Sequence, residues 1–128
     1  MSERRRPGVA EEDQAAEYLL SLGYTLLGRR VKMTRGELDL VALDEDVVVI
    51  VEVKARRTEL PEATITRGKS ERIRAAAAEY LARHGLEGRE LRFDLVTFSS
   101  EGLRHHPGGL ALDEDASGDA RTKYDELG

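Results

Sequence analysis

The segment from residue 35 to residue 57, RGELDLVALDEDVVVIVEVKARR, most constrains how this 128-residue chain can fold. Two runs rich in Val, Leu and Ile, ELDLVAL and VVVIVEVKA, flank the short polar sequence DED. Such runs around a short polar break are typical of two buried strands that form a tight hairpin. Yet the segment also holds Glu37, Asp39, Glu52 and Lys54, and charged side chains are rarely buried without partners. The segment therefore predicts a functional or ion-paired site within the apolar sheet.

The length of the connection decides which side chains of this hairpin meet. Directly opposed residues share a face of the sheet, with their Cβ atoms ~5 Å apart. A two-residue turn at residues 45–46 would place Asp39 opposite Glu52, and Glu37 opposite Lys54. A turn one residue earlier makes Asp39 a diagonal neighbour of Glu52, whereas a three-residue loop would break the arrangement. In the first strand, alternation gives one face Glu37, Asp39, Val41 and Leu43, and the other face Leu38, Leu40 and Ala42.

Two carboxylates that converge in this way repel each other, and their burial costs several kcal/mol in lost hydration. A divalent cation offsets much of this cost. A set of oxygen ligands without His or Cys favours Mg²⁺ or Mn²⁺ over Zn²⁺. The spacing alone leaves a second interpretation equally open, a structural ion pair of Lys54 with Glu52 or Glu37.

Hydrophobic periodicity predicts the remaining elements. We expect helices over residues 9–22 and 69–84, strands over 24–33 and 91–98, a turn at 34–36, a loop over 58–68, and a short strand or helix near 110–112. With the hairpin, the order is helix, three strands, helix, strand. This order predicts an α/β fold, a mixed four- to five-stranded sheet flanked by helices, in a single domain over residues 9–112.

Each predicted helix has one apolar stripe. The stripe of the first helix comprises Ala15, Ala16, Leu19, Leu20 and Leu22, and that of the second comprises Ile73, Ala76, Ala77, Tyr80 and Leu81. Helical spacing places Glu12 on or beside the stripe of the first helix. A favourable carboxylate in the first helical turn is the alternative interpretation of Glu12.

The two ends of the chain differ in charge. Residues 1–8 predict a flexible basic arm, and residues 113–128 predict a disordered acidic tail with a net charge of −4. The rest of the chain then carries −1 of the total −5, so the overall charge does not exclude a nucleic-acid partner.

The chain contains no Cys, which excludes disulfides, thiol catalysis and cysteine metal sites. It has no apolar run of ~18 residues, so no membrane span is expected. The basic N-terminus lacks the apolar stretch of a secretory signal, and we therefore expect a cytoplasmic protein.

The charged hairpin matches a known signature. Asp39 followed on the next strand by Glu52-Val53-Lys54 is the PD-(D/E)xK nuclease motif. With Glu12, GELDLVA, VVIVEVKARR, Lys69, Tyr80-Leu81 and RFDLV, the region from about Val9 to Phe98 resembles the YraN-like family of small bacterial proteins, and the same motifs resemble archaeal Holliday-junction resolvases. Arg30 stands where that family usually has Asn, the hairpin turn lacks the usual Gly, and the sequence after Phe98 departs from the family.

The resemblance implies a restriction-endonuclease-like fold and a metal-dependent site. Asp39, Glu52 and the backbone carbonyl of Val53 would bind Mg²⁺, and Glu12 would approach directly or through water. Lys54 would orient the attacking water or stabilise charge on the phosphate. The cation would act as a Lewis acid and lower the pKa of its water for in-line attack on a phosphodiester.

Other charged residues have two interpretations each. Glu37 either pairs with Lys54 or an Arg, or supports the metal. The bases near the site are each typical of solvated surface charge, but together they predict a phosphate track: Arg56, Arg57, Arg67, Lys69, Arg72 and Arg74. We expect Tyr80 in the core and His105-His106 in a loop without a metal role.

The leading hypothesis is a Mg²⁺- or Mn²⁺-dependent nuclease that hydrolyses DNA, with branched or structured DNA among its candidate substrates. The alternative is a nucleic-acid-binding or scaffolding protein with the same fold and little hydrolysis. A domain whose charges are merely structural is the third option. A homodimer is compatible with the resemblance, because many resolvases work as dimers.

Overall fold

The computed structural model describes residues 9–55 and 67–110. The predicted basic arm at 1–8, the predicted acidic tail at 113–128, and Arg56 and Arg57 lie outside these ranges. The described elements are α1 (Val9–Ser21), β1 (Thr25–Lys32), β2 (Glu37–Asp44), β3 (Val47–Ala55), α2 (Arg67–Arg83), β4 (Leu91–Ser99) and β5 (Gly102–His106).

The strands form one five-stranded sheet in the order β1-β2-β3-β4-β5. The β3–β4 pair is parallel, and α2 lies in the connection between these two strands. The other neighbouring pairs are antiparallel. The predicted mixed four- to five-stranded sheet flanked by helices is therefore confirmed, and it has five strands.

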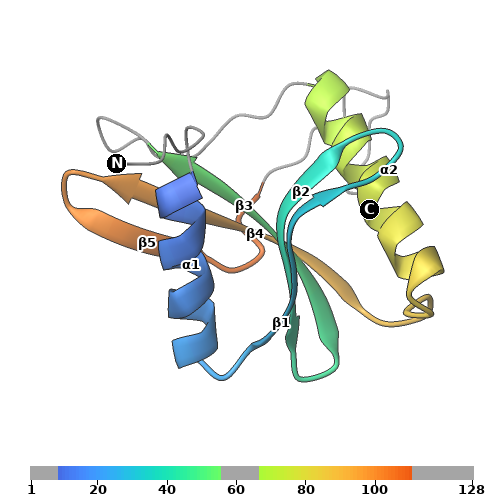
Figure 1. Ribbon diagram of the computed structural model, residues 1–128, viewed down its shortest axis with the longest axis horizontal. Coiled ribbons are helices and arrows are strands. Elements are labelled where there is room, and N and C mark those ends of the chain that lie inside the picture. The colour runs from blue at the N-terminus through green and yellow to red at the C-terminus, as the bar shows by residue number, and fades with distance from the viewer. Residues whose placement is uncertain (1–8, 56–66, 111–128) are drawn as a thin grey trace, which may run out of the picture.

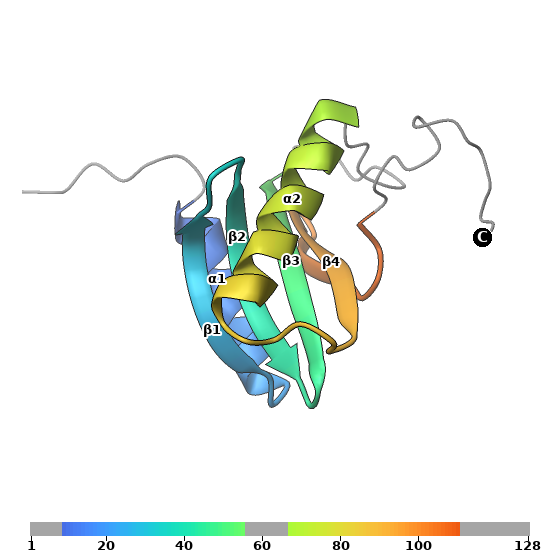
Figure 2. The same cartoon turned by 90° about the vertical axis from the view of Figure 1, so that its right-hand side faces the viewer.

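The two helices cover opposite faces of the sheet, with α1 on one side and α2 on the other (Figures 1 and 2). The core is accordingly split into two clusters. The α1 cluster is built on Ala15, Ala16, Leu19, Leu40, Val49, Val51 and Val96, and the α2 cluster on Leu38, Val41, Val48, Ile50, Ile73, Ala76, Ala77, Tyr80, Leu95 and Leu110. The predicted burial of Tyr80 is confirmed. Of the described helices, neither combines the length and apolar character needed to cross a bilayer.

The predicted stripe of α1 is too wide. Leu20 and Leu22 are 49% and 47% exposed, so their assignment to the buried face is wrong. The sheet contacts the narrower line of Ala15, Ala16 and Leu19, in which Leu19 follows the two alanines by four and three residues. Leu20 is turned about 100° from Leu19 around the helix axis, and Leu22 follows the last helical residue.

Strand β5 was not predicted, and the expected loop at His105-His106 is wrong. These residues pair with Val96 and Leu95 of β4 across an antiparallel ladder. As an edge strand rich in polar residues, β5 lacks the apolar alternation that reveals buried strands in a sequence. Its backbone bonds to β4 decide its conformation.

The hairpin has the predicted two-residue turn. Asp44 pairs with Val47, and the ladder continues in this register to Leu40 and Val51. Glu45 supplies the positive φ, 58°, that a tight hairpin turn requires and that Gly adopts more readily.

Regular alternation fails near Asp39. Leu38 packs in the α2 cluster and Leu40 in the α1 cluster, although residues two apart in a regular strand share a face. The prediction that Leu38 and Leu40 face the same side is therefore wrong. In β1, the residues paired with Leu40 and Leu38 are Arg29 and Val31, and Arg30 between them has a positive φ of 46°.

Candidate functional site

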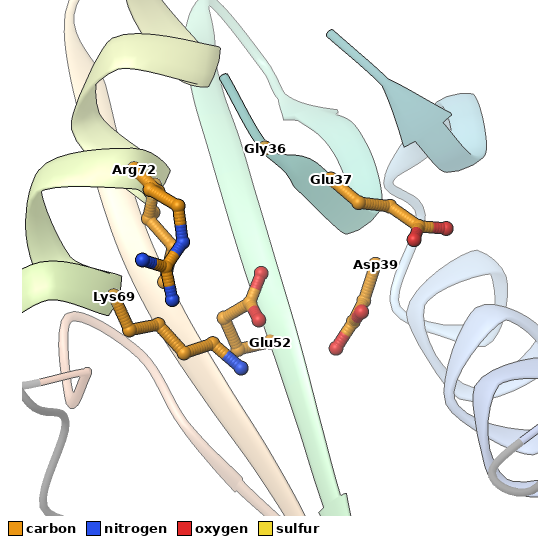
Figure 3. Close-up of a pocket in the computed structure, with 7 residues that line it drawn as sticks. Gly36, Glu37, Asp39, Glu52, Lys69 and Arg72 are labelled. Atoms are coloured by element: carbon orange, nitrogen blue, oxygen red, sulfur yellow. The ribbon is translucent and has the colours of Figure 1, made fainter. Parts of the chain in front are cut away.

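A pocket of about 250 Å³ opens between the charged ends of β2 and β3 and the first turns of α2 (Figure 3). Its described lining is Gly36, Glu37, Asp39, Glu52, Lys69, Arg72 and Ile73. The structure thus brings together five of the residues that the sequence singled out, three acids from the hairpin and two bases from the helix. Lys69 and Arg72 lie on the α2 side of the pocket, and Asp39 and Glu52 lie on its hairpin side (Figure 3).

Asp39 is held in the gap where β2 and β3 cease to pair. Its Oδ2 atom accepts a hydrogen bond of 2.8 Å from the backbone amide of Val53. Burial raises the pKa of the Asp39 carboxyl, and the Val53 amide and the Lys69 charge partly oppose that rise. The Val53 amide therefore fixes the direction of the carboxylate within the pocket.

Glu52 is the more strongly perturbed acid. Its side chain is only 1% exposed, and among the described residues its Oε2 atom has no hydrogen-bond partner. Burial, followed by the charge of Asp39, raises the pKa of Glu52 to about 8, against the opposing effects of Lys69 and Lys54. A buried carboxylate oxygen without a partner is costly and calls for a proton or a cation.

These two acids fit a divalent cation. They supply hard oxygen donors, which Mg²⁺ and Mn²⁺ prefer. The Oε2 atom of Glu52, which has no hydrogen-bond partner among the described residues, provides a ligand atom for a cation inside the pocket, beside Asp39. Within residues 9–55 and 67–110, however, there is no group of three or more His, Cys, Asp or Glu side chains close enough to hold a metal.

The other predicted acids lie differently. The Oε1 atom of Glu12 accepts a hydrogen bond of 3.0 Å from Arg30, and Glu12 is not among the described residues that line the pocket. Glu37 lines the pocket, but its carboxylate points away from that of Glu52 (Figure 3). The metal roles of Glu12, Glu37 and the Val53 carbonyl therefore stay predictions.

Of the predicted basic residues, some line the pocket and others do not. Lys69 extends from α2 toward the two acids, and Arg72 lies one turn further along the helix (Figure 3). Lys54 follows on β3 and is half-buried, but it is not among the described lining residues. Burial, followed by the charge of Lys69, lowers the pKa of Lys54. Arg67 is the first residue of α2.

Two contacts hold α2 against the β1–β2 turn. Thr34 donates hydrogen bonds to the Glu79 carboxylate from its backbone amide at 2.8 Å and its hydroxyl at 2.9 Å. A Cβ atom added at Gly36 would lie only 3.2 Å from the backbone oxygen of Arg72, so Gly36 permits close approach of the helix. Sequence reasoning placed Thr34 and Gly36 in a turn but missed their contacts with α2, because Glu79 and Arg72 are far away in the chain.

A second charged cluster, centred on Asp94, also escaped sequence reasoning. Asp94 is fully buried and accepts hydrogen bonds from Arg92, from the Gly108 amide at 2.7 Å and from the ring of His105 at 2.9 Å. Burial raises the pKa of Asp94, but His105 and Arg92 outweigh it and lower the pKa to about 2. Arg92 also bonds Asp44 and Tyr24. The available signal was an Asp inside the apolar strand sequence RFDLV.

Comparison with known proteins gives the family. The model of "Uncharacterised protein family UPF0102" matches residues 11–98. A UPF0102 protein of Symbiobacterium thermophilum is 44% identical over 95 residues, which cover 72% of this chain and 80% of that protein. A UPF0102 protein of Sulfurihydrogenibium is 32% identical over 87% of this chain and 99% of its own length, and one of Myxococcus xanthus is 37% identical over 85% and 92%. The chain therefore belongs to the UPF0102 family, the YraN-like family that its motifs resemble.

Proposed function

We propose that this protein is a nuclease that hydrolyses DNA phosphodiester bonds with the help of Mg²⁺ or Mn²⁺. The observation that carries the proposal is the Glu52 carboxylate, buried beside Asp39 with one oxygen lacking a partner among the described residues. A domain that used these acids only as structural ion pairs would leave no such oxygen, because an unsatisfied buried carboxylate destabilises the fold.

The distribution of charge supports a phosphate substrate. The acids come from β2 and β3, whereas Lys69 and Arg72 come from α2 across the pocket. Acids attract a cation and bases attract an anion, so a metal ion with a phosphate group satisfies both walls. DNA offers such phosphates along its whole length, and Arg56, Arg57 and Arg67 would extend the contact along its backbone.

In this proposal the fold is restriction-endonuclease-like, and each residue has a stated task. Asp39 and Glu52 would hold the cation, with the Val53 carbonyl and Glu12 completing its ligands. A bound divalent cation supplies Lewis-acid polarisation of the phosphate and a more acidic water. Lys54 would orient the attacking water, and the Val53 amide would keep Asp39 in place.

A second candidate function is a nucleic-acid-binding or scaffolding module with little hydrolysis. It is favoured by the position of Glu12, which is paired with Arg30. It is also favoured by the lack of a three-acid cluster in the part of the chain that the structure describes. In this case removal of a carboxylate would leave DNA binding intact or tighten it, because repulsion of phosphate would fall.

One cleavage assay separates the two functions. Duplex, single-stranded, flap and four-way DNA are incubated with the wild type and with Glu52→Ala, each with Mg²⁺, Mn²⁺ or a chelator. We expect metal-dependent cleavage by the wild type and none by the variant. Binding without cleavage supports the scaffolding function, and equal cleavage by both proteins overturns the assigned site.

Location and assembly belong to the same proposal. A cytoplasmic protein would meet chromosomal DNA, and a homodimer would present two pockets to the two strands of a branched substrate. Sedimentation velocity of the full chain, alone and with four-way DNA, measures the assembly.

A further inference from the structure

We propose that Lys69 of α2 is a catalytic residue of this pocket, which contacts the phosphate under attack, while Lys54 acts beside it. This inference rests on the proposed function and assigns the substrate contact at the same site. The nuclease motif itself draws attention to Lys54, the lysine two residues after Glu52.

The first support is the direction in which α2 presents Lys69. Ile73 follows Lys69 by one helical turn, and residues four apart lie on the same helix face. Ile73 is 2% exposed and packs in the α2 cluster with Leu38 and Ile50. Because Ile73 faces the sheet, the Lys69 stem is directed to the same side, and its ammonium group lies beside the acids (Figure 3).

The second support is the position of Lys69 relative to the carboxylates. Lys69 lines the pocket with Asp39 and Glu52, whereas Lys54 is not among the described lining residues. Burial is the main influence on the pKa of both acids, and Lys69 opposes the rise of each pKa more strongly than Lys54 does. Lys69 is therefore the lysine whose charge acts more strongly on the site.

The third support is the pairing of two like charges. Burial, followed by the positive charge of the nearby Lys69, lowers the pKa of Lys54, so the two ammonium groups lie close enough to influence each other. Two ammonium groups at that separation repel each other, because their charges are alike. An anion bound between them relieves the repulsion, and a phosphate oxygen has the required charge.

The helix is also fixed well enough to place a catalytic group. Glu79 binds Thr34 through two hydrogen bonds, and Gly36 lets the β1–β2 turn approach Arg72 closely. Gly36 and Arg72 themselves line the pocket, and Gly36 directly precedes Glu37 at the start of β2. Rigid support of this kind keeps a catalytic side chain in its productive geometry.

A positive charge at this position assists the proposed chemistry. The oxygen of a water molecule forms a new bond to phosphorus, and the bond from phosphorus to one sugar oxygen breaks. The water loses one proton to solvent, and the leaving sugar oxygen gains one, so the products are a phosphate monoester and an alcohol. Negative charge is redistributed over the phosphoryl oxygens in the transition state, and the Lys69 ammonium group stabilises this charge.

The test compares Lys69→Ala and Lys69→Arg with the wild type and with Arg89→Ala, a control that removes an exposed cation from the α2–β4 connection. Two quantities are measured. The first is kcat and KM for DNA cleavage with Mg²⁺. The second, which needs no activity, is the melting temperature with Mg²⁺ alone and with Mg²⁺ plus inorganic phosphate. Unliganded melting curves confirm that each variant is folded.

We expect Lys69→Ala to lower kcat roughly 100-fold, as loss of one group that stabilises transition-state charge typically does. This variant should keep the rise in melting temperature with Mg²⁺ alone and lose the additional rise with phosphate. Lys69→Arg should restore part of kcat and part of the additional rise with phosphate. Arg89→Ala should match the wild type.

The outcomes separate this inference from the proposed function. If the wild type cleaves DNA and Lys69→Ala cleaves equally well, the inference is wrong and the proposed function stands. If the wild type does not cleave, the nuclease proposal fails, and the shift of melting temperature with phosphate then tests the contact of Lys69 with phosphate. A shift that is present in the wild type and lost in Lys69→Ala supports this contact. The absence of a shift in the wild type overturns it.

Discussion

Asp39 of β2 and Val53 of β3 are joined side chain to backbone, by the 2.8 Å hydrogen bond from the Val53 amide to Asp39 Oδ2. This bond lies just beyond the last regular pair of the hairpin, Leu40 with Val51. The carboxylate thus replaces a backbone partner at the point where the strands separate. It couples the local integrity of the sheet to the position of an acid in the pocket.

Replacing Asp39 separates these two tasks. Asp39→Ala should lower the free energy of unfolding by about 1–3 kcal/mol, because the Val53 amide loses its partner. Asp39→Asn keeps an oxygen acceptor and should retain most of the stability. Both variants should lose the rise in melting temperature that Mg²⁺ or Mn²⁺ gives the wild type. Asp46→Asn, at a fully exposed carboxylate in the hairpin turn, is the matched control. An unchanged metal shift in Asp39→Asn would exclude Asp39 as a ligand.

Glu52 makes metal-free stability depend on pH. Its pKa rises from 4.5 to about 8 on folding, so the folded state holds a proton that the unfolded state has lost between these values. The free energy of unfolding should therefore fall as pH rises from about 4.5 to about 8. Glu52→Gln should flatten this slope and stabilise the metal-free protein near pH 8 by roughly a few kcal/mol. Urea denaturation at several pH values with a chelator measures this, and a wild-type stability that rises over this range contradicts it.

Replacement of Asp94 should lower the free energy of unfolding strongly without changing the pocket. Asp94→Ala leaves Arg92 and His105 without their buried partner and should cost about 3–5 kcal/mol. Because folding lowers the pKa of Asp94 from 3.8 to about 2, its contribution is present above pH 3.8 and is lost as pH falls toward 2. Asp13→Ala, which removes a half-exposed partner of Arg29, should cost under about 1 kcal/mol. Urea denaturation at pH 7 and at low pH measures the free energy of unfolding of both variants. Equal losses of stability in Asp94→Ala and Asp13→Ala at pH 7 would contradict the structural role assigned to Asp94.

Gly36 should control the width of the pocket. Gly36→Val places side-chain atoms against the Arg72 backbone, which an α-helix cannot easily move. We expect about 1–3 kcal/mol of destabilisation and a loss of cleavage on the order of 100-fold through displacement of Lys69. Gly68→Ala meets only an ordinary contact with the Arg72 side chain and should preserve cleavage. Wild-type kcat in Gly36→Val would show that the helix position does not limit the reaction.

Local sequence determined much of the hairpin. Alternating apolar residues and a two-residue polar turn fix the register of adjacent strands, so the proximity of Asp39 and Glu52 followed from counting residues. The same counting failed at Leu38, because the alternation of β2 is interrupted where it pairs with β1 on either side of Arg30, whose φ is positive. It also failed for Leu20 and Leu22, because periodicity gives the apolar side of a helix but not the width that a sheet covers.

The sequence by itself determined the two helices, the first four strands, the hairpin and its pair of acids, because these depend on residues a few positions apart. Only the tertiary structure decided that Lys69 reaches those acids, that Glu12 pairs with Arg30, and that His105 bonds Asp94. Each of these contacts joins residues from separate elements. Their meeting depends on how the helices and the edge strand pack on the sheet, which no local pattern of side chains encodes.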